Sequence, residues 1–511
     1  MFLKKSLLGG IALSALTGAA ALAGPDDGTL NMAFSFPIEG IDEVYDPKPE
    51  TDFSASAVFN NLAAYDPNTG TYSGVLASDF TPVDDVTWDI ALREGITFHD
   101  GSAFNAEDVA YTLNFLVDPE ARFPSKARYS FIDNAEVVDD YTVRVHLNRP
   151  YAAIMARFAT GMPMYPSDLH GALEDKALWG KTPVGTGPYR AVEVSSETGL
   201  VLERYEDYTV GDKPEIERIV IRPIPDAQSQ IAELLTGGID IFAASSSDVI
   251  TSVDGMPGVT TTVSEDLSFL YVMIDAAGRS GNTPLTDLKV RQAIAHAINR
   301  EEIRTNLTGA RDEAPAMDRL CFARQVDCPA GGSPASYDPD TARALLSEAG
   351  YGDGFDLTIT TTSNMQQFAD AVAGYLRAVG IRAGVKTETI GAYRKSRADG
   401  ALEVTVMFFT HAGMPDAGYS PTFYFGNASS DYTGDPRFAD MALRADSEAG
   451  ETRLATLTEL YDLMDSEAVL FPLSANPIVF IHNEGVALDK TDRGGLLNPY
   501  GISAHNVAWS E

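Results

Sequence analysis

The sequence has little cysteine, few basic residues and few long apolar segments. Its 511 residues include 2 cysteines, and 37 lysines and arginines against 73 aspartates and glutamates. Two thiols are too few for a disulfide-rich scaffold or a thiolate metal cluster. The formal net charge of -36 repels phosphate backbones and anionic lipid surfaces, so we predict that the protein binds no nucleic acid.

Residues 1–23 have the three parts of a secretory signal peptide. Lys4 and Lys5 form a basic head, an apolar segment rich in small residues follows, and Ala-Leu-Ala at residues 21–23 suits cleavage before Gly24. The alternative is a retained anchor, but the apolar segment is too short for this, and no later segment approaches the roughly 18 apolar residues of a membrane span. Cleavage removes two lysines and no acid, which changes the net charge from -36 to -38. No cysteine near the cleavage point could carry a lipid, so we expect a soluble exported protein, most simply of a bacterial periplasm.

Helix and strand patterns alternate along the rest of the chain, whose length favours two or three domains. Residues 30–36 have the pattern of a strand, and Asn105 is suited to cap a helix that carries Val109 and Leu113 on its apolar face. In the second half, residues 404–408 have the alternating pattern of a further strand. The chain has no internal repeat or low-complexity linker, so we predict an α/β fold.

No catalytic, metal or cofactor motif is complete. Residues 70–74 resemble a Gly-x-Ser-x-Gly elbow, but the serine stands one place late. The seven histidines are scattered, and no two have the i, i+4 spacing that places two imidazoles on one helix face. Residues 185–187, Gly-Thr-Gly, lack the third glycine of a dinucleotide-binding loop. We therefore predict no enzyme activity, no metal and no cofactor; a secreted hydrolase with an unrecognised site is the alternative.

The two cysteines, Cys321 and Cys328, enclose six residues. In an oxidising compartment, two thiols this close most simply form a local disulfide that pins a loop. A redox-active pair is the alternative, but the spacing is not Cys-x-x-Cys.

Several sequence blocks follow one another in a characteristic order. They are Trp88, Phe98-His99-Asp100-Gly101, Asn105-Ala106-Glu107-Asp108-Val109, Gly185-Thr186-Gly187-Pro188-Tyr189, Lys289-Val290-Arg291-Gln292-Ala293-Ile294 and Tyr337-Asp338-Pro339. In this order they resemble family 5 of the bacterial extracellular solute-binding proteins, the peptide- and nickel-type substrate-binding proteins of ABC transporters. The resemblance covers residues 24–511. The blocks themselves are expected to be mostly scaffold, with Trp88 and Phe98 packed in a core.

The resemblance implies a two-lobed periplasmic binding protein, type II-like and of class C, with an extra subdomain in lobe I. The chain order assigns residues 24–265 and 485–511 to lobe I, about 55–185 to the extra subdomain, and 266–484 to lobe II. Ligand that touches both lobes stabilises a closed state by its differential affinity. The implied partners are a small solute or peptide and the permease subunits of an ABC transporter, and we expect a monomer.

The resemblance also implies candidate ligand contacts. In peptide-binding members an aspartate in a lobe II loop pairs with the peptide's ammonium group, and Asp416 stands in the matching loop. A buried carboxylate makes charge-assisted hydrogen bonds to such a group. The alternative is that Asp416 only supports its own turn. We predict Asn364, His411 and Tyr419 as polar or stacking contacts, and Phe36 as a contact from lobe I.

One departure from the family pattern bears on the ligand. Dipeptide-specific members carry an arginine that binds the peptide carboxylate soon after a lobe II strand, and the matching residues 360–367 contain no cation. The sequence therefore predicts a periplasmic solute-binding subunit for a peptide-like ligand other than a strict dipeptide. An opine, an oligosaccharide or a nickel chelate is the alternative ligand, and a chaperone-like or sensory role is an alternative function on the same fold.

Overall fold

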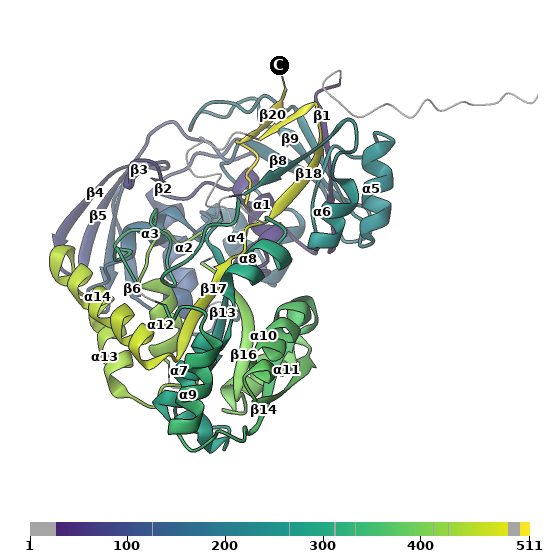
Figure 1. Ribbon diagram of the computed structural model, residues 1–511. Helices are drawn as coiled ribbons and strands as arrows, with labels where there is room; N and C mark the ends of the chain where they lie inside the picture. The colour runs from purple at the N-terminus through teal and green to yellow at the C-terminus, as the bar shows by residue number, and fades with distance from the viewer. Residues whose placement is uncertain are drawn as a thin grey trace, which may run out of the picture.

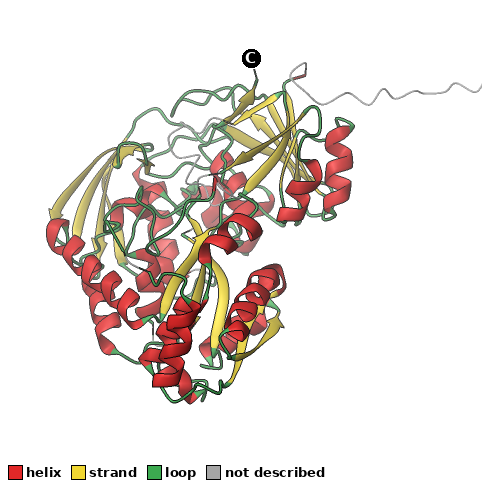
Figure 2. Ribbon diagram, in the orientation of Figure 1, coloured by secondary structure: helices red, strands yellow, loops and turns green. Residues whose placement is uncertain are grey.

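The computed structural model describes residues 27–510, except 125, 265, 311–312, 333, 412, 428 and 489–500. The predicted signal peptide, residues 1–23, lies outside the described residues. Figure 1 shows two units joined near the middle of the molecule, and Figure 2 shows helices and strands mixed in both. Within the described ranges, no helix is both long and apolar enough to cross a membrane.

The first unit, lobe I, is built on a seven-stranded sheet with the order β12-β18-β11-β1-β10-β9-β8. Strand β1 pairs in parallel with β10 and β11, and the other neighbours are antiparallel. The strands are β1 (Thr29–Phe34), β8 (Tyr189–Ser195), β9 (Gly199–Arg204), β10 (Arg218–Pro223), β11 (Ile241–Ala243), β12 (Val259–Val263) and β18 (Val479–Asn483). The accompanying elements are α1 (Pro49–Val58), α5 (Ala227–Leu235), α6 (Ser247–Val253) and the hairpin of β19 (Val486–Leu488) and β20 (Val507–Trp509).

An extra subdomain is inserted between β1 and β8 of lobe I. Its four-stranded antiparallel sheet has the order β4-β5-β7-β6, and one hydrophobic core runs from this sheet into the sheet of lobe I. Asn105 and Asp108 form a capping box at the start of its main helix, because each side chain bonds to the backbone at the other's position. The elements are β2 (Ala63–Asp66), β3 (Thr71–Gly74), β4 (Ala77–Asp84), β5 (Thr87–Leu92), α2 (Ala106–Val117), β6 (Ile132–Asp139), β7 (Thr142–Leu147), α3 (Ile154–Ala159) and α4 (Ser167–Ala172).

The second unit, lobe II, has a five-stranded sheet with the order β15-β14-β16-β13-β17 and a separate hydrophobic core. Its strands are β13 (Ser268–Ile274), β14 (Asp356–Thr362), β15 (Arg382–Glu388), β16 (Val404–Thr410) and β17 (Leu470–Ala475). Its helices are α7 (Leu288–Ala297), α8 (Arg300–Leu307), α9 (Pro339–Glu348), α10 (Gln366–Ala378), α11 (Ile390–Ala398), α12 (Tyr419–Phe425), α13 (Pro436–Ala445) and α14 (Gly450–Glu467). Each unit therefore has its own sheet and its own hydrophobic core, as separate domains do.

The chain returns from lobe II to lobe I earlier than residue 485, where the sequence placed the boundary. Strand β18 ends at Asn483 and already pairs with β11 and β12 of the lobe I sheet. The two connections between the units lie side by side, since the backbone N–H of Ile478 donates to Asp266 Oδ1 at 3.1 Å and the N–H of Ser264 donates to the Ile478 carbonyl at 2.8 Å. The boundary was placed wrongly because β17 and β18 are both apolar and only three residues separate them.

The sequence blocks that carried the resemblance are built into the scaffold. His99 accepts a hydrogen bond from the N–H of Gly185 at 3.3 Å and donates one to the carbonyl of Gly187 at 2.9 Å. A Cβ atom at Gly185 would lie 2.0 Å from the carbonyl oxygen of Val58. Only glycine permits this close backbone approach. The predicted structural role of these blocks agrees with these contacts, and Phe98 is fully buried.

Candidate functional site

A cavity of about 550 Å³ lies between the extra subdomain and lobe II. This volume is within the usual range for small-molecule sites, which is ~300–1,000 Å³. The extra subdomain contributes the 3-10 turn η2 (Lys126–Tyr129) and α3, and lobe II contributes α12 and the loop before it. The side chains that decide its chemistry are Arg128, Arg149, Tyr151, Arg157, Arg397, Asp416, Tyr419, Phe423 and Asp446.

The two units touch each other around this cavity. The backbone N–H of Ala152 donates to the carbonyl of Asp446 at 2.7 Å, and Arg149 forms an ion pair with the Asp446 carboxylate at 3.3 Å. The hydroxyl of Tyr65 donates to the carbonyl of Arg324 at 2.8 Å. A ligand in the cavity would therefore contact both units in the arrangement that the structure has.

Asp416 lines the cavity, but its charge is already paired. The residue is 2% exposed, and its Oδ1 lies 2.7 Å from Nη2 of the equally buried Arg453. The same oxygen accepts a hydrogen bond from the N–H of Gly418 at 2.8 Å, so Asp416 also supports its turn. Arg453 binds Asp327 in addition, with Nη1 and Oδ2 2.5 Å apart. An ammonium group that approached Asp416 would have to compete with a buried guanidinium.

The loop that carries Asp416 is braced by the disulfide loop. Cys321 and Cys328 are joined in a disulfide. Within the closed loop, the N–H of Val326 donates to the carbonyl of Pro415 at 2.7 Å, and the N–H of Ala417 donates back to the Val326 carbonyl at 3.0 Å. The disulfide therefore holds a segment that is hydrogen-bonded to the wall of the cavity, which the cysteine spacing by itself did not reveal.

Arg157 is a buried cation in the cavity wall. It is 6% exposed, and its Nε donates to the hydroxyl of Tyr151 at 3.4 Å. Its guanidinium carbon lies 5.2 Å from the ring centroid of Tyr419, a cation–π distance. Among the described residues, no carboxylate lies within 4.0 Å of its nitrogens. Tyr419, predicted as a stacking contact, therefore lines the cavity and stacks on a cation of the protein.

The other predicted contacts lie outside this wall. His411 is buried, its Nδ1–H donates to the carbonyl of Leu267 at 3.0 Å, and burial lowers its pKa to about 4. Asn364 is exposed and accepts a hydrogen bond from the hydroxyl of Thr362 at 2.7 Å. Phe36 is 63% exposed and is not among the residues that line the cavity. Of the five predicted contacts, the cavity brings together Asp416 and Tyr419.

Sequence reasoning missed the arginines of the cavity. Arg128, Arg149 and Arg157 come from the extra subdomain, whereas Arg397 lies in the last turn of α11 in lobe II, more than two hundred residues later. No spacing or local motif relates residues so far apart. The one signal in the sequence was that basic residues are rare in this acidic chain, so each arginine was a candidate for a specific role.

Comparison with known proteins identifies the family. The family model described as bacterial extracellular solute-binding proteins, family 5 middle, matches residues 71–431. The chain belongs to this family. The predicted family is thereby confirmed.

Relatives of this family 5 protein include binding proteins for several solutes. The glutathione-binding protein GsiB of Escherichia coli (strain K12) is 28% identical over 451 residues, which cover 81% of this chain and 82% of GsiB. The solved structure of the periplasmic binding protein DppA of Helicobacter pylori, in complex with the peptide STSA, has a TM-score of 0.78 at 22% identity and covers 94% of this chain and 98% of that one. NikA of Brucella suis, in complex with Fe(III)-EDTA, has a TM-score of 0.82 at 21% identity, with 94% and 100% covered. These structures share the predicted two-lobed α/β fold, which is confirmed.

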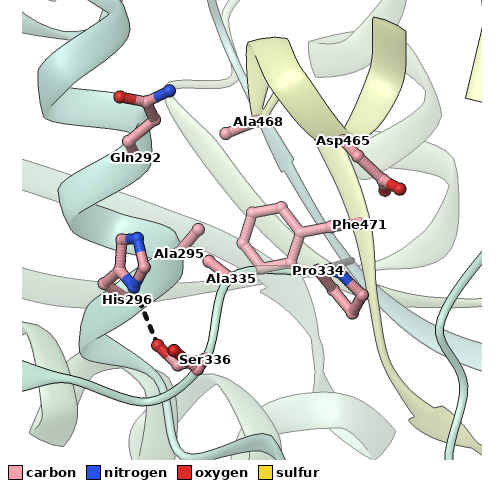
Figure 3. Close-up of a pocket in the computed structure, with 9 residues that line it drawn as sticks. All are labelled: Gln292, Ala295, His296, Pro334, Ala335, Ser336, Asp465, Ala468 and Phe471. Carbon is pink, nitrogen blue, oxygen red and sulfur yellow. Dashed lines mark hydrogen bonds between the residues drawn. The ribbon is translucent and has the colours of Figure 1, made fainter. Parts of the chain in front are cut away.

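A second pocket of this family 5 protein, about 320 Å³, lies within lobe II (Figure 3). His296 is fixed in its wall by a hydrogen bond between Nδ1 and the carbonyl of Ser336 at 2.8 Å. Figure 3 shows the carboxylate of Asp465 pointing away from Phe471, which forms the apolar side of the pocket. A ligand bound there would touch lobe II alone, so the pocket cannot link ligand binding to the relative position of the two units.

Direct metal binding finds no support in the side chains. Within the part of the chain that the structure describes, no group of three or more His, Cys, Asp or Glu side chains could hold a metal ion. The acidic groups of the cavity wall are also engaged, since Asp416 and Asp446 each pair with an arginine. A metal in this cavity would therefore need ligands of its own, as in a chelate.

Proposed function

We propose that this protein is the periplasmic solute-binding subunit of an ABC importer, which encloses a peptide-like ligand and delivers it to a permease. The observation that carries the proposal is the cavity between the extra subdomain and lobe II, whose wall comes from both units. A ligand in this cavity contacts both units only when the units touch. Its binding therefore stabilises that arrangement relative to one in which the units are separated. The permease would then recognise the closed form.

The lining of the cavity supports a ligand with polar ends and an apolar middle. The aromatic rings of Phe131, Tyr151, Tyr419 and Phe423 provide apolar and stacking surface, and the arginines and Thr422 provide hydrogen-bond donors. Such a mixture suits a short peptide read through its backbone and its terminal groups. The alternative is a non-peptide solute such as an opine, an oligosaccharide or a nickel chelate.

Thermal unfolding of the purified mature protein tests the proposal. We add each candidate ligand in turn: glutathione, a set of tri- and tetrapeptides, an opine, an oligosaccharide and nickel-histidine. A ligand that binds the native state increases the free energy of unfolding by RT ln(1 + [L]/Kd) and thereby raises Tm. The peptide solutions are analysed again after incubation, because a binding protein leaves them intact and a hydrolase does not. Peptides that raise Tm and remain uncleaved support the proposal. If only a non-peptide raises Tm, the peptide-like ligand is wrong.

A cavity-filling variant and a matched control locate the site. Ala127→Trp places a large ring at the cavity wall, where Ala127 is exposed in η2. Ala172→Trp makes the same change at an exposed position of the same subdomain, at the end of α4 and outside the cavity wall. Ala127→Trp is expected to abolish the ligand-induced rise in Tm, and Ala172→Trp to retain it. Equal binding by both variants would place the ligand elsewhere.

A further inference from the structure

The charge of the cavity wall is opposite to that of the chain. The protein has a formal net charge of -36, yet the wall contains four arginines and two carboxylates. Both carboxylates are paired with arginine already: Asp446 with Arg149 at 3.3 Å, and Asp416 with Arg453, behind the wall, at 2.7 Å. The cavity therefore presents more positive than negative charge to whatever enters it.

Arg157 supplies the main excess charge. A guanidinium buried to 6% exposure loses most of its hydration, and this loss is normally offset by a carboxylate partner. Arg157 has instead the hydroxyl of Tyr151 and the ring of Tyr419, both neutral. Its side chain is held in place on two sides and lacks an anion in the described structure, which is the arrangement expected of a ligand-binding arginine.

Arg397 supplies a second positive charge from the other unit. It stands in the last turn of α11 in lobe II, with its guanidinium carbon 5.0 Å from the ring centroid of Phe423. In the described ranges, no ion pair joins it to an aspartate or glutamate. The cavity thus has one arginine without a carboxylate partner on each side, Arg157 on the extra subdomain and Arg397 on lobe II.

The remaining arginine, Arg128, is partly compensated. Burial raises the pKa of the neighbouring Glu43 to about 7 and that of Asp52 well above its usual range, and the positive charge of Arg128 opposes both rises. Because those two acids share its field, we do not count Arg128 as excess charge.

We propose that the cavity selects an anionic ligand, whose acidic groups bind Arg157 on one side and Arg397 on the other. The inference deepens the proposed function and rests on it, since it names the ligand class of the same cavity. Arg157 and Arg397 line the same cavity from different units, and the repulsion between their like charges disfavours contact between the units in the empty protein. An anion that bridges them replaces repulsion by two charge-assisted interactions. The charge of the ligand would thus couple ligand binding to closure of the two units.

Calorimetric titration of the mature protein with four probes tests the ligand class: Glu-Glu-Glu, Ala-Ala-Ala, Lys-Lys-Lys and citrate. We expect Glu-Glu-Glu to bind at least roughly ten-fold more tightly than Ala-Ala-Ala, with a further loss for Lys-Lys-Lys, because carboxylate side chains make charge-assisted hydrogen bonds to arginine whereas ammonium groups are repelled. Equal affinity for Ala-Ala-Ala and Glu-Glu-Glu would overturn the anionic ligand and leave the peptide-binding function standing. Binding of citrate but of no peptide would support the anionic ligand and overturn the peptide-binding function. If no probe binds, the anionic ligand is wrong.

Arginine variants locate the charge. Arg397→Gln keeps hydrogen-bonding capacity without charge, at a half-buried position, and is expected to weaken Glu-Glu-Glu binding roughly ten-fold and Ala-Ala-Ala binding by a smaller factor. Arg394→Gln is the matched control, because Arg394 is exposed on the same helix and does not line the cavity. At the buried site, Arg157→Lys keeps the charge while Arg157→Gln removes it, so retained binding in the lysine variant and loss in the glutamine variant separate charge from folding. Unchanged Glu-Glu-Glu affinity in both Arg397→Gln and Arg157→Gln would overturn the proposal.

Discussion

The Nη2 atom of Arg453 lies 2.7 Å from Oδ1 of Asp416, and both side chains are almost completely buried. The guanidinium also reaches Asp327 in the disulfide loop and the carbonyl of Ala445. One cation thus connects α14, the cavity wall and the disulfide loop. Asp416 is therefore part of a structural network, and its carboxylate does not face the cavity as an unpaired charge.

This relationship predicts the behaviour of Asp416→Asn. The substitution leaves the buried Arg453 with one carboxylate in place of two, so we expect a loss of about 3 kcal/mol in the free energy of unfolding. Urea denaturation monitors it, with Asp370→Asn at an exposed position of α10 as a control that should change stability little. A fully stable Asp416→Asn protein that loses affinity for Lys-Lys-Lys would instead assign Asp416 the role of an ammonium anchor.

The disulfide should affect ligand binding as well as stability. Replacing both Cys321 and Cys328 by serine opens a short loop, for which the expected cost is at most about 3 kcal/mol. Because Val326 in this loop is hydrogen-bonded to Pro415 and Ala417, we also expect weaker binding of whichever probe the parent protein binds. Titration of the parent with and without dithiothreitol measures the same effect without mutation. Identical affinity of the oxidised and reduced proteins would show that the cavity wall does not need the brace.

The buried histidine His411 predicts a loss of stability in acid. Burial lowers its pKa from 6.5 to about 4, so the unfolded chain binds a proton more readily than the folded one between these values. The stabilising contribution is complete above pH 6.5 and falls as the pH decreases to about 4, by up to about 3 kcal/mol. Urea denaturation at several pH values measures the slope, which His411→Phe should reduce. His296→Phe is the control and should leave the dependence of stability on pH unchanged. An equal pH dependence in the parent and His411→Phe proteins would contradict the prediction.

The close backbone approach at Gly185 predicts a strong effect of a single methyl group. Gly185→Ala would place the new Cβ 2.0 Å from the carbonyl oxygen of Val58. Relief of this clash requires the backbone to move, which would disturb the hydrogen bond from the N–H of residue 185 to His99. We expect a clear decrease in Tm. Gly374→Ala is the control, because no atom beyond the adjoining backbone of helix α10 lies within 4 Å of the added Cβ and alanine favours the helix by about 1 kcal/mol. A Gly185→Ala protein as stable as the parent would show that the backbone at Val58 yields easily.

The sequence was most informative where a signal is local. The cap at Asn105, the strand predicted at residues 404–408 and the pairing of the two cysteines each depend on neighbours in the chain. The structure has all three, and its strand continues two residues further, to Thr410. The lobe boundary was wrong by one strand, because β17 and β18 have the same apolar pattern although they belong to different sheets. Pairing partners, which distinguish the two strands, are not encoded in the periodicity of either.

By itself, the sequence determined the α/β class, the family, the position of the disulfide and the segment that carries Asp416 and Tyr419. The tertiary structure alone decided that Asp416 is paired with Arg453, that His411, Asn364 and Phe36 lie outside the cavity wall, and that Arg157 and Arg397 line one cavity. The physical reason is that secondary structure follows from local backbone and packing preferences. The charge of a site is instead a sum over side chains that meet only when distant segments fold together.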